Sequence, residues 1–282
     1  MAASDSINGS IRNKKAKRKV VFVMGATATG KSKLSIDLAK HFNGEIINSD
    51  KIQFYEGLDI ITNKVTEAEA RGLPHYMLGF INDPNVDFTA DDFCRHAIAS
   101  IDAISDKGKL PIVAGGSNSY LERLIEDPKF SFRVNFDCLF IWLDVAVLTL
   151  YKRVGTRVDE MVGAGLVEEV RGMFFPDTDY TRGIWRAIGA PELHRYFMLE
   201  EVIGVDESTK MLEDAIEEIK GNTRKLVDCQ LGKIRRLRVE RGWNMHRIDA
   251  TSVHQKRGED AEEEWKTKVL DKSVMLVKEF LY

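Results

Sequence analysis

Short apolar runs alternate with longer amphipathic segments along the chain from residue 20 onward. This alternation is typical of βαβ units, in which crossover helices cover a parallel sheet. The runs predict strands at residues 20–24, 45–48, 76–81, 110–114, 138–143 and 245–248. The first, fourth and fifth runs are almost wholly apolar rather than alternating, which indicates strands that are buried on both faces. The pattern therefore predicts an α/β fold with a doubly wound parallel sheet.

Helical periodicity fills the intervals between these runs. It predicts helices at residues 31–41, 90–107, 120–126 and 146–154. From about residue 157 to 226 the strand signals stop, and the chain shows amphipathic helices such as 166–174 and 209–220. We therefore expect a core domain of residues 20–156 and 227–282, with a helical insertion subdomain of residues 157–226.

The first 19 residues are polar, and no apolar stretch of the kind found in a secretory signal occurs among them. Their last positions carry five cations, Lys14, Lys15, Lys17, Arg18 and Lys19. We interpret residues 1–19 as a disordered basic leader. The scarcity of acidic residues would also suit the remnant of an organelle transit peptide, so the sequence leaves both plastid stroma and cytoplasm open.

Composition narrows the class of protein. Of 282 residues, 44% are hydrophobic and 30% are charged, as in folded globular proteins and unlike disordered chains. Apolar runs stay far below the ~20 residues of a membrane-spanning helix, so we expect a soluble protein without a membrane partner. Cys94, Cys138 and Cys229 lie far apart, which argues against a disulfide framework or a zinc ribbon. The net charge of −3 gives no general attraction to nucleic acid, which would require a local basic patch.

The strongest chemical signal is the segment GATATGKS at residues 25–32, a full GxxxxGK[ST] match between a predicted strand and a predicted helix. Its glycines let backbone amides turn toward a phosphate, Lys31 adds a full positive charge, and Ser32 can bind Mg²⁺. This P-loop predicts a ligand with at least two linked phosphates. It does not identify that ligand, because hydrolases, kinases and other enzymes share the motif.

Two carboxylates follow predicted strands. Asp50 lies at the C-terminal end of the second strand, the edge where open α/β sheets bind ligands, and could accept a proton there. The alternative, that Asp50 caps the segment beginning at Lys51, has equal support from the sequence. Asp144 ends the fifth strand, and we interpret it as the cap of the helix that follows rather than as a magnesium ligand.

A second glycine-rich turn, GGSNSY at residues 115–120, follows the fourth strand and opens a helix. Its backbone can approach a ligand closely, and its serine hydroxyls can donate hydrogen bonds. A plain strand-to-helix turn explains the composition equally well. Its position on the same sheet edge as the P-loop favours a role in binding.

Six segments in order, spread over residues 19–237, resemble the isopentenyltransferase family: GATATGKS, NSDKIQFYEGLDIITNK, IVAGGSNSYLERLI, RVDEMVGAGLVEEV, RAIGAPEL and NTRKLVDCQLGKIRRL. The likeness is strongest to plant adenylate isopentenyltransferases, which transfer a dimethylallyl group to N6 of free ATP, ADP or AMP and begin cytokinin synthesis. Related enzymes modify an adenosine of tRNA. The resemblance implies a P-loop NTPase-like fold with a helical insertion.

The resemblance also implies roles for individual residues. The P-loop would bind the diphosphate of dimethylallyl diphosphate with Mg²⁺ at Ser32, Asp50 would be the general base, and Thr27 would lie beside the departing oxygen. Arg157 would close over the phosphates, although an ion pair with Asp159 or Glu160 is the alternative. The implied diphosphate-binding residues are Gly25, Ala28, Thr29, Gly30, Lys31, Ser32 and Ser117. The implied nucleotide-binding residues are Asn48, Ser49, Lys220, Arg224 and Lys233.

Departures from the tRNA-modifying pattern favour a free nucleotide. The segment RAIGAPE at residues 186–192 lacks the tyrosine-lysine pair that commonly follows its glycine in those enzymes, and no Cys2His2 finger follows. A basic cluster keeps tRNA open as the alternative: Lys233, Arg235, Arg236, Arg238 and Arg241. The P-loop and Asp50 alone would also permit a small-molecule kinase or a noncatalytic nucleotide-binding module. We expect a monomer that acts on small molecules.

Overall fold

The computed structural model describes residues 17–282, and most of the predicted leader lies outside them. Arg18 and Lys19, which we assigned to that leader, are the first residues of a strand. Six parallel strands form one sheet in the order β3-β2-β4-β1-β5-β6. They are β1 (Arg18–Met24), β2 (Gly44–Asn48), β3 (His75–Tyr76), β4 (Leu110–Ala114), β5 (Phe136–Asp144) and β6 (Met245–Asp249). The predicted parallel α/β sheet is thus confirmed.

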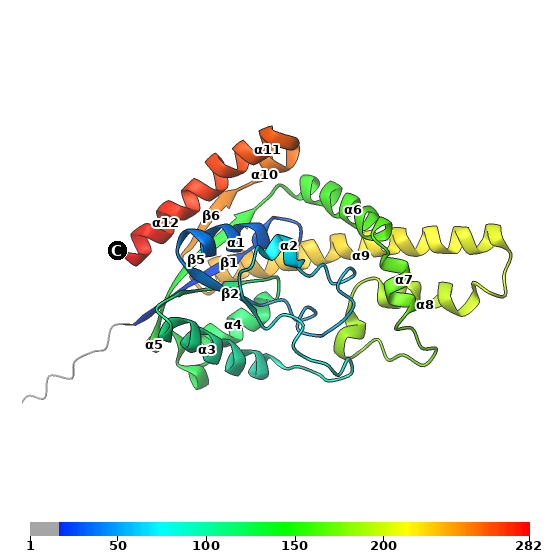
Figure 1. The fold of residues 1–282 in the computed structure, drawn as a ribbon, viewed down its shortest axis with the longest axis horizontal. Coiled ribbons are helices and arrows are strands. Elements are labelled where there is room, and N and C mark those ends of the chain that lie inside the picture. The colour runs from blue at the N-terminus through cyan, green and yellow to red at the C-terminus, as the bar shows by residue number, and fades with distance from the viewer. Residues whose placement is uncertain (1–16) are drawn as a thin grey trace, which may run out of the picture.

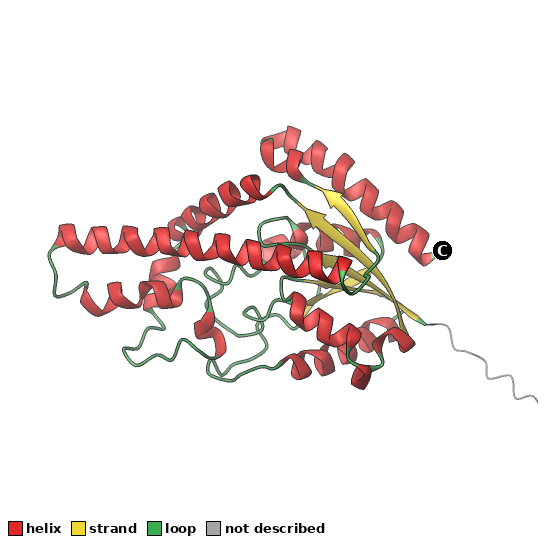
Figure 2. Ribbon diagram, turned by 180° about the vertical axis from the view of Figure 1, so that it is seen from behind, coloured by secondary structure: helices red, strands yellow, loops and turns green. Residues whose placement is uncertain are grey.

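Helices cover both faces of this sheet (Figures 1 and 2). In β1, Phe22 packs in the core on one face while Val21 and Val23 pack on the other. One face is covered mainly by α3, α4 and the end of α9, and the other by α1, α11 and α12. The helices are α1 (Lys31–His41), α2 (Glu67–Ala70), α3 (Ala90–Asp106), α4 (Asn118–Glu126), η1 (Pro128–Phe130), α5 (Phe132–Asn135), α6 (Val147–Gly163), α7 (Leu166–Arg171), η2 (Gly183–Arg186), α8 (Ala190–Leu199), α9 (Val205–Val239), α10 (Thr251–Gln255), α11 (Gly258–Trp265), η3 (Lys266–Leu270) and α12 (Asp271–Leu281).

The strand predicted at residues 76–81 is largely wrong, because β3 has only two residues. Met77 and Gly79 adopt φ angles of 61° and 60°, and this left-handed backbone cannot continue an extended strand. Ile81 forms one isolated bridge to Tyr55 instead. After β3 the chain therefore leaves the sheet and continues as irregular structure as far as α3.

The helical part projects from the carboxyl end of the sheet (Figure 1). The 35-residue α9 runs the length of this projection and then packs against the core. Both predicted boundaries, at 156/157 and 226/227, fall inside continuous helices, α6 and α9. The Tyr151 hydroxyl of α6 also donates to the Asp228 carboxylate of α9 at 2.7 Å. The insertion thus continues from the core through two packed helices, and its division from the core stays a prediction.

The predicted capping role of Asp144 is wrong. Helix α6 begins after Ala146, whose backbone N–H donates to the Thr251 hydroxyl at 2.9 Å. The carboxylate of Asp144 instead accepts from Arg247 Nε at 2.7 Å. Arg247 comes from β6, which pairs with β5 about 100 positions later in the chain, so local sequence could not reveal this partner. No helix among residues 17–282 has the length and apolar character to cross a membrane.

Candidate active site

The P-loop joins β1 to α1 and is shaped by close backbone approaches. A side chain at Gly25 would place its Cβ 2.5 Å from the carbonyl oxygen of Leu143. Gly30 adopts a φ of 97°, which favours glycine, and a Cβ there would lie 2.9 Å from the indole of Trp265. The loop also holds Ala28 at a φ of 67°. A backbone held in this uncommon conformation is typical of a functional site.

Lys31 folds back over the P-loop. Its Nζ donates to the carbonyl oxygen of Ala26 at 2.6 Å. Burial lowers the pKa of Lys31 to about 8, although the nearby Asp50 carboxylate opposes the shift and Arg157 adds to it. The ammonium is therefore still mostly protonated at neutral pH, and it is poorly solvated, so an incoming phosphate can bind it strongly.

Arg157 reaches the P-loop from α6. Its Nη1 donates to the Thr27 hydroxyl at 3.1 Å. The alternative ion pairs are not formed, because Asp159 pairs with Lys220 at 2.7 Å and Glu160 pairs with Arg153 at 2.8 Å. Burial lowers the pKa of Arg157 to about 10, so the guanidinium remains charged at neutral pH. The structure thus brings Thr27, Lys31 and Arg157 together at one loop.

Asp50 lies between the P-loop and the second glycine turn. One carboxylate oxygen accepts from the backbone N–H of Ile52 at 3.2 Å, which makes a local turn rather than a helix cap. The other oxygen lies 3.3 Å from the position that a Cβ on Gly116 would occupy. Burial raises the pKa of Asp50, opposed by the Ile52 hydrogen bond and the charge of Lys31. A carboxylate with a raised pKa beside a phosphate site can accept a proton.

The second turn, residues 115–117, is here called the glycine loop. A Cβ on Gly115 would lie 2.4 Å from the backbone carbon of Ser49, so only glycine fits. Ser117 accepts from the backbone N–H of Lys51 through its hydroxyl at 2.9 Å. Asn48 donates to the carbonyl oxygen of Met77 at 3.1 Å and accepts from the backbone N–H of Asp50 at 3.1 Å. Asn48 and Ser49 are both buried; the Asn48 side chain bonds to the turn at Asp50, and the Ser49 hydroxyl has no hydrogen-bond partner among the described residues.

Gln230 of α9 joins the two loops, and the sequence analysis did not single it out. Its Oε1 accepts from the backbone N–H of Thr27 at 2.7 Å, and its Nε2 donates to the carbonyl oxygen of Gly116 at 3.2 Å. The available signal was a glutamine on a helix face whose neighbours Leu231 and Ile234 are apolar. A buried polar side chain on such a face requires partners, which this one finds in loops more than 100 positions away.

The cations assigned to the nucleotide divide into two groups. Lys220 is held by Asp159 and Glu217 at 2.7 and 2.8 Å, and Arg224 lies against Gly155 of α6. Lys233 instead lies near Lys51, which Arg186 also approaches. Burial lowers the pKa of Lys51, and the charges of Arg186 and Lys233 lower it further. We call Lys51, Arg186 and Lys233 the cation cluster.

The basic cluster near the end of α9 is partly neutralised. Arg236 and Arg241 both form ion pairs with Glu122 of α4, the second at 3.1 Å. Arg238 lies over the Trp142 ring at 5.8 Å. These contacts tie much of the basic cluster to the core, which weakens the argument for a phosphate-binding surface there.

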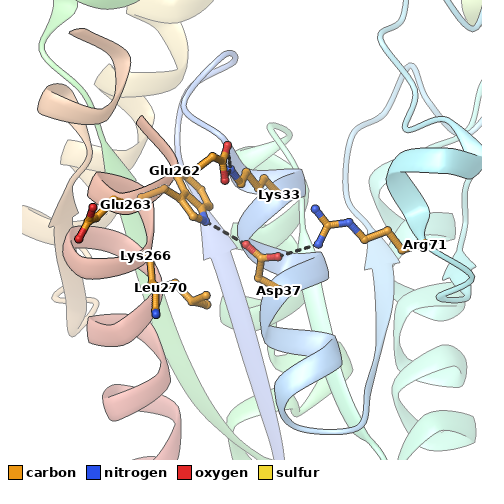
Figure 3. A pocket seen from close by; sticks show the side chains of 8 residues that line it. Lys33, Asp37, Arg71, Glu262, Glu263, Lys266 and Leu270 are labelled. Carbon is orange, nitrogen blue, oxygen red and sulfur yellow. Dashed lines mark hydrogen bonds and ion pairs between the residues drawn. The ribbon is translucent and has the colours of Figure 1, made fainter. Parts of the chain in front are cut away.

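Two hollows lie near the P-loop, one beside Arg157 and one beside Lys33, and no residue of the loop lines either of them. One, of about 570 Å³, lies between α6 and the chain after β2, and Arg157 lies in its wall with Ile60, Val65, Leu78 and Met161. The other, of about 480 Å³, lies on α1 beside Trp265 (Figure 3). There the Trp265 indole donates to Asp37 at 2.9 Å, and Lys33 pairs with Glu262 at 2.6 Å. The second hollow holds none of the predicted site residues and marks where α11 supports α1.

The chain matches known proteins over most of its length. A family model described as IPP transferase matches residues 53–133 and 127–236. Adenylate isopentenyltransferase 5, chloroplastic, of Arabidopsis thaliana is 52% identical over 94% of this chain and 81% of the relative. Adenylate isopentenyltransferase 7, mitochondrial, of the same plant is 49% identical over 94% of this chain and 80% of the relative.

Solved structures show the same fold. A eukaryotic dimethylallyltransferase acting on tRNA has a TM-score of 0.77 and 25% identity, covering 94% of this chain and 80% of the other. The tRNA isopentenylpyrophosphate transferase of Staphylococcus epidermidis has a TM-score of 0.73 and 26% identity, covering 93% and 99%. The P-loop precedes the residues matched by the family model, while the full-length comparisons extend over it.

Proposed function

The chain belongs to the IPP transferase family, and from this premise we propose that it transfers the dimethylallyl group of dimethylallyl diphosphate to the N6 amine of free ATP, ADP or AMP. This reaction begins cytokinin synthesis. The observation that carries the proposal is the convergence of Lys31, Arg157 and Thr27 on one loop, with the Asp50 carboxylate beside it. That arrangement suits a leaving diphosphate on one side and an amine that loses a proton on the other.

The donor's diphosphate is assigned to the P-loop. Breaking the allylic C–O bond builds negative charge on the leaving diphosphate, which Lys31, Arg157 and the loop amides stabilise. Thr27 lies beside the departing oxygen, with its hydroxyl held by Arg157. The 570 Å³ hollow beside Arg157 has apolar side chains, such as Ile60 and Met161, among charged ones, and we assign the prenyl chain to its apolar part. The remaining assigned diphosphate ligands are Gly25, Ala28, Thr29, Gly30, Ser32 and Ser117.

Asp50 is assigned as the general base. The exocyclic amine of adenine is a poor nucleophile, because its lone pair is delocalised into the ring. A carboxylate that accepts its proton during attack makes the amine more nucleophilic. The raised pKa of Asp50 supports this role, since burial makes the carboxylate a stronger base.

Mg²⁺ is proposed as the metal that accompanies the donor. Ser32 is exposed in the first turn of α1, where its hydroxyl would hold a metal that accompanies the donor. Among residues 17–282, no three acidic, histidine or cysteine side chains group together as a protein metal site. Ser32 therefore fits a cation that receives one ligand from the protein and most of its ligands from water and the diphosphate. When bound, it would neutralise charge on the leaving group.

The cation cluster is proposed to bind the phosphates of the nucleotide. Lys51 follows the general base directly, and Lys233 lies one helical turn beyond Gln230 on α9. Arg186 also pairs with Asp87 at 3.3 Å, so Lys51 and Lys233 are the members of the cluster to which we assign the anionic ligand. Lys220 already has two acidic partners, so we assign it to the contact between α6 and α9 rather than to the nucleotide. Arg224, against α6, stays a secondary candidate.

A tRNA acceptor is the second candidate, because the solved structures with this fold are named for tRNA. Two observations favour the free nucleotide. Arg236 and Arg241 are paired with Glu122, and the relative at 52% identity is named an adenylate isopentenyltransferase. We further propose that the protein acts as a monomer. A plastid location is favoured because relatives at 52% and 48% identity are named chloroplastic, although one at 49% is named mitochondrial.

Product analysis tests the proposal. The protein is incubated with Mg²⁺, dimethylallyl diphosphate and γ-labelled ATP, and the products are examined by mass spectrometry. We expect the mass of one dimethylallyl group on adenine, with the label still on the nucleotide. Movement of the label to another molecule would indicate a kinase, and binding without donor-dependent turnover would indicate a noncatalytic module.

A further inference from the structure

Gln230 is a buried polar side chain whose two hydrogen-bonding groups are both used. It lies on the face of α9 that packs on the core, and it is only 6% exposed. Its side-chain oxygen binds the P-loop at Thr27, and its side-chain nitrogen binds the glycine loop at Gly116. An apolar residue would fill this place without the cost of burying an amide, so the amide points to a requirement beyond packing.

The chemistry of the two partners fixes the orientation of the amide. The backbone N–H of Thr27 can only donate, and the carbonyl oxygen of Gly116 can only accept. Gln230 therefore cannot flip without losing both bonds. The contact at Gly116 is close: a Cβ there would lie 2.3 Å from Gln230 Nε2 and 3.3 Å from an oxygen of Asp50. Gln230 and the carboxylate thus flank the same backbone atom.

From these contacts we propose that Gln230 is a positioning residue that holds the P-loop and the glycine loop at a fixed separation around Asp50. The inference rests on the proposed function and adds a residue to it. Gln230 sets the position of Thr27, and hence of the leaving oxygen, relative to the base that receives the proton. A displacement of about 1 Å between reacting groups can cost about 100-fold in rate.

The same helix extends this link to the nucleotide site. The backbone carbonyl oxygen of Gln230 accepts from the Asn118 side chain at 3.4 Å, so α9 contacts both the glycine loop and the start of α4, which follows that loop. Lys233 of the cation cluster follows on the same helix. One rigid element therefore positions groups assigned to the donor, the base and the acceptor.

Two substitutions at Gln230 separate positioning from a general effect on folding. Gln230→Met keeps the side-chain length and removes both hydrogen bonds. Gln230→Glu keeps an acceptor for Thr27 but turns a carboxylate oxygen toward Gly116 and places a like charge near Asp50. A matched control is Gln255→Met, the same change at an exposed glutamine at the end of α10. Should Gln230→Met fail to fold, Gly116→Ala disturbs the same contact from the other side.

The readouts are kcat, the KM for dimethylallyl diphosphate, and the pH profile of kcat/KM, with thermal unfolding as the folding control. We expect Gln230→Met to lower kcat about 10- to 100-fold with little change in KM. The acidic limb of its pH profile should stay where it is in the wild type. Gln230→Glu should move that limb about one pH unit upward, because a nearby negative charge disfavours ionisation of Asp50. Gln255→Met should match the wild type.

Two results would overturn the inference while leaving the proposed function intact. One is a folded Gln230→Met variant with kcat within threefold of an active wild type. The other is a pH profile of Gln230→Glu that coincides with that of Gln230→Met. A wild-type protein that prenylates no adenine acceptor would contradict the proposed function itself.

Discussion

Asp50 is the residue on which the proposed chemistry depends most. Asp50→Asn keeps the size and one acceptor oxygen but cannot take up the proton of the amine. We expect kcat to fall by about 10²- to 10⁴-fold, the usual contribution of a general base, while the P-loop still binds the donor. The measurement is kcat together with donor affinity, with circular dichroism to verify folding. If the folded variant keeps a kcat within threefold of the wild-type value, Asp50 is not the general base and serves only the local turn.

Lys31 gives a second prediction at this scale, on pH. Its pKa is lowered to about 8, so the ammonium loses its proton, and its charge, as the pH rises through that value. The kcat/KM for the donor, which reports the free enzyme, should therefore fall above about pH 8. The acidic limb should come from Asp50, whose raised pKa makes the base inactive as the pH falls.

Lys31→Arg tests the assignment of the alkaline limb. Arginine keeps its charge over this range, so the variant should be slower but should lack the decline above pH 8. Lys33→Arg, two positions along α1, is the matched control and should keep the wild-type profile. An unchanged alkaline limb in Lys31→Arg would assign that limb to another group.

At the scale of elements, α11 supports the P-loop from behind. Trp265 is only 4% exposed, its ring meets Gly30, and its indole N–H donates to Asp37 of α1. Trp265→Ala should cost about 3–5 kcal/mol of stability, as expected for removing a buried tryptophan, and should raise the KM for the donor. Trp265→Phe, which loses the hydrogen bond but keeps much of the packing, should cost less. Urea unfolding that ranks the two variants equally would contradict this view of the contact.

The cation cluster links the start of the irregular segment after β2 with α9. Lys233→Met should raise the KM for ATP more than the KM for AMP, because AMP presents fewer phosphates to the cluster. Lys225→Met, at an exposed position of the same helix, is the control. Equal effects of Lys233→Met on both nucleotides would place Lys233 away from the terminal phosphates.

Elements with strong local patterns could be predicted from the sequence, and contacts between distant segments could not. The prediction for α1 was confirmed at both ends because the P-loop fixes where the helix begins. The strand predicted at 76–81 was largely wrong because the left-handed backbone at Met77 leaves no trace in the apolar pattern. Asp144 and Gln230 have partners about 100 or more positions away, on β6 and in the two loops. No spacing rule in the sequence could have identified those contacts.

For the whole molecule, two continuous helices connect the sheet to its helical projection. Helix α6 presents Arg157 to the P-loop, and α9 presents Gln230 to both the P-loop and the glycine loop. The sheet supplies the two loops and Asp50 at its carboxyl edge, as expected for open α/β folds. The site is therefore assembled from both parts of the chain, and neither part contains it alone.

A competition in one vessel distinguishes a free adenine nucleotide from tRNA as the acceptor. Dimethylallyl diphosphate is supplied in limiting amount with Mg²⁺, ATP and an unmodified tRNA at equal concentrations of reactive adenine, and both acceptors are analysed by mass spectrometry. We expect the added mass on N6 of the free nucleotide, with its phosphates intact. Addition mainly to the tRNA, with the steep salt dependence of many phosphate contacts, would contradict it.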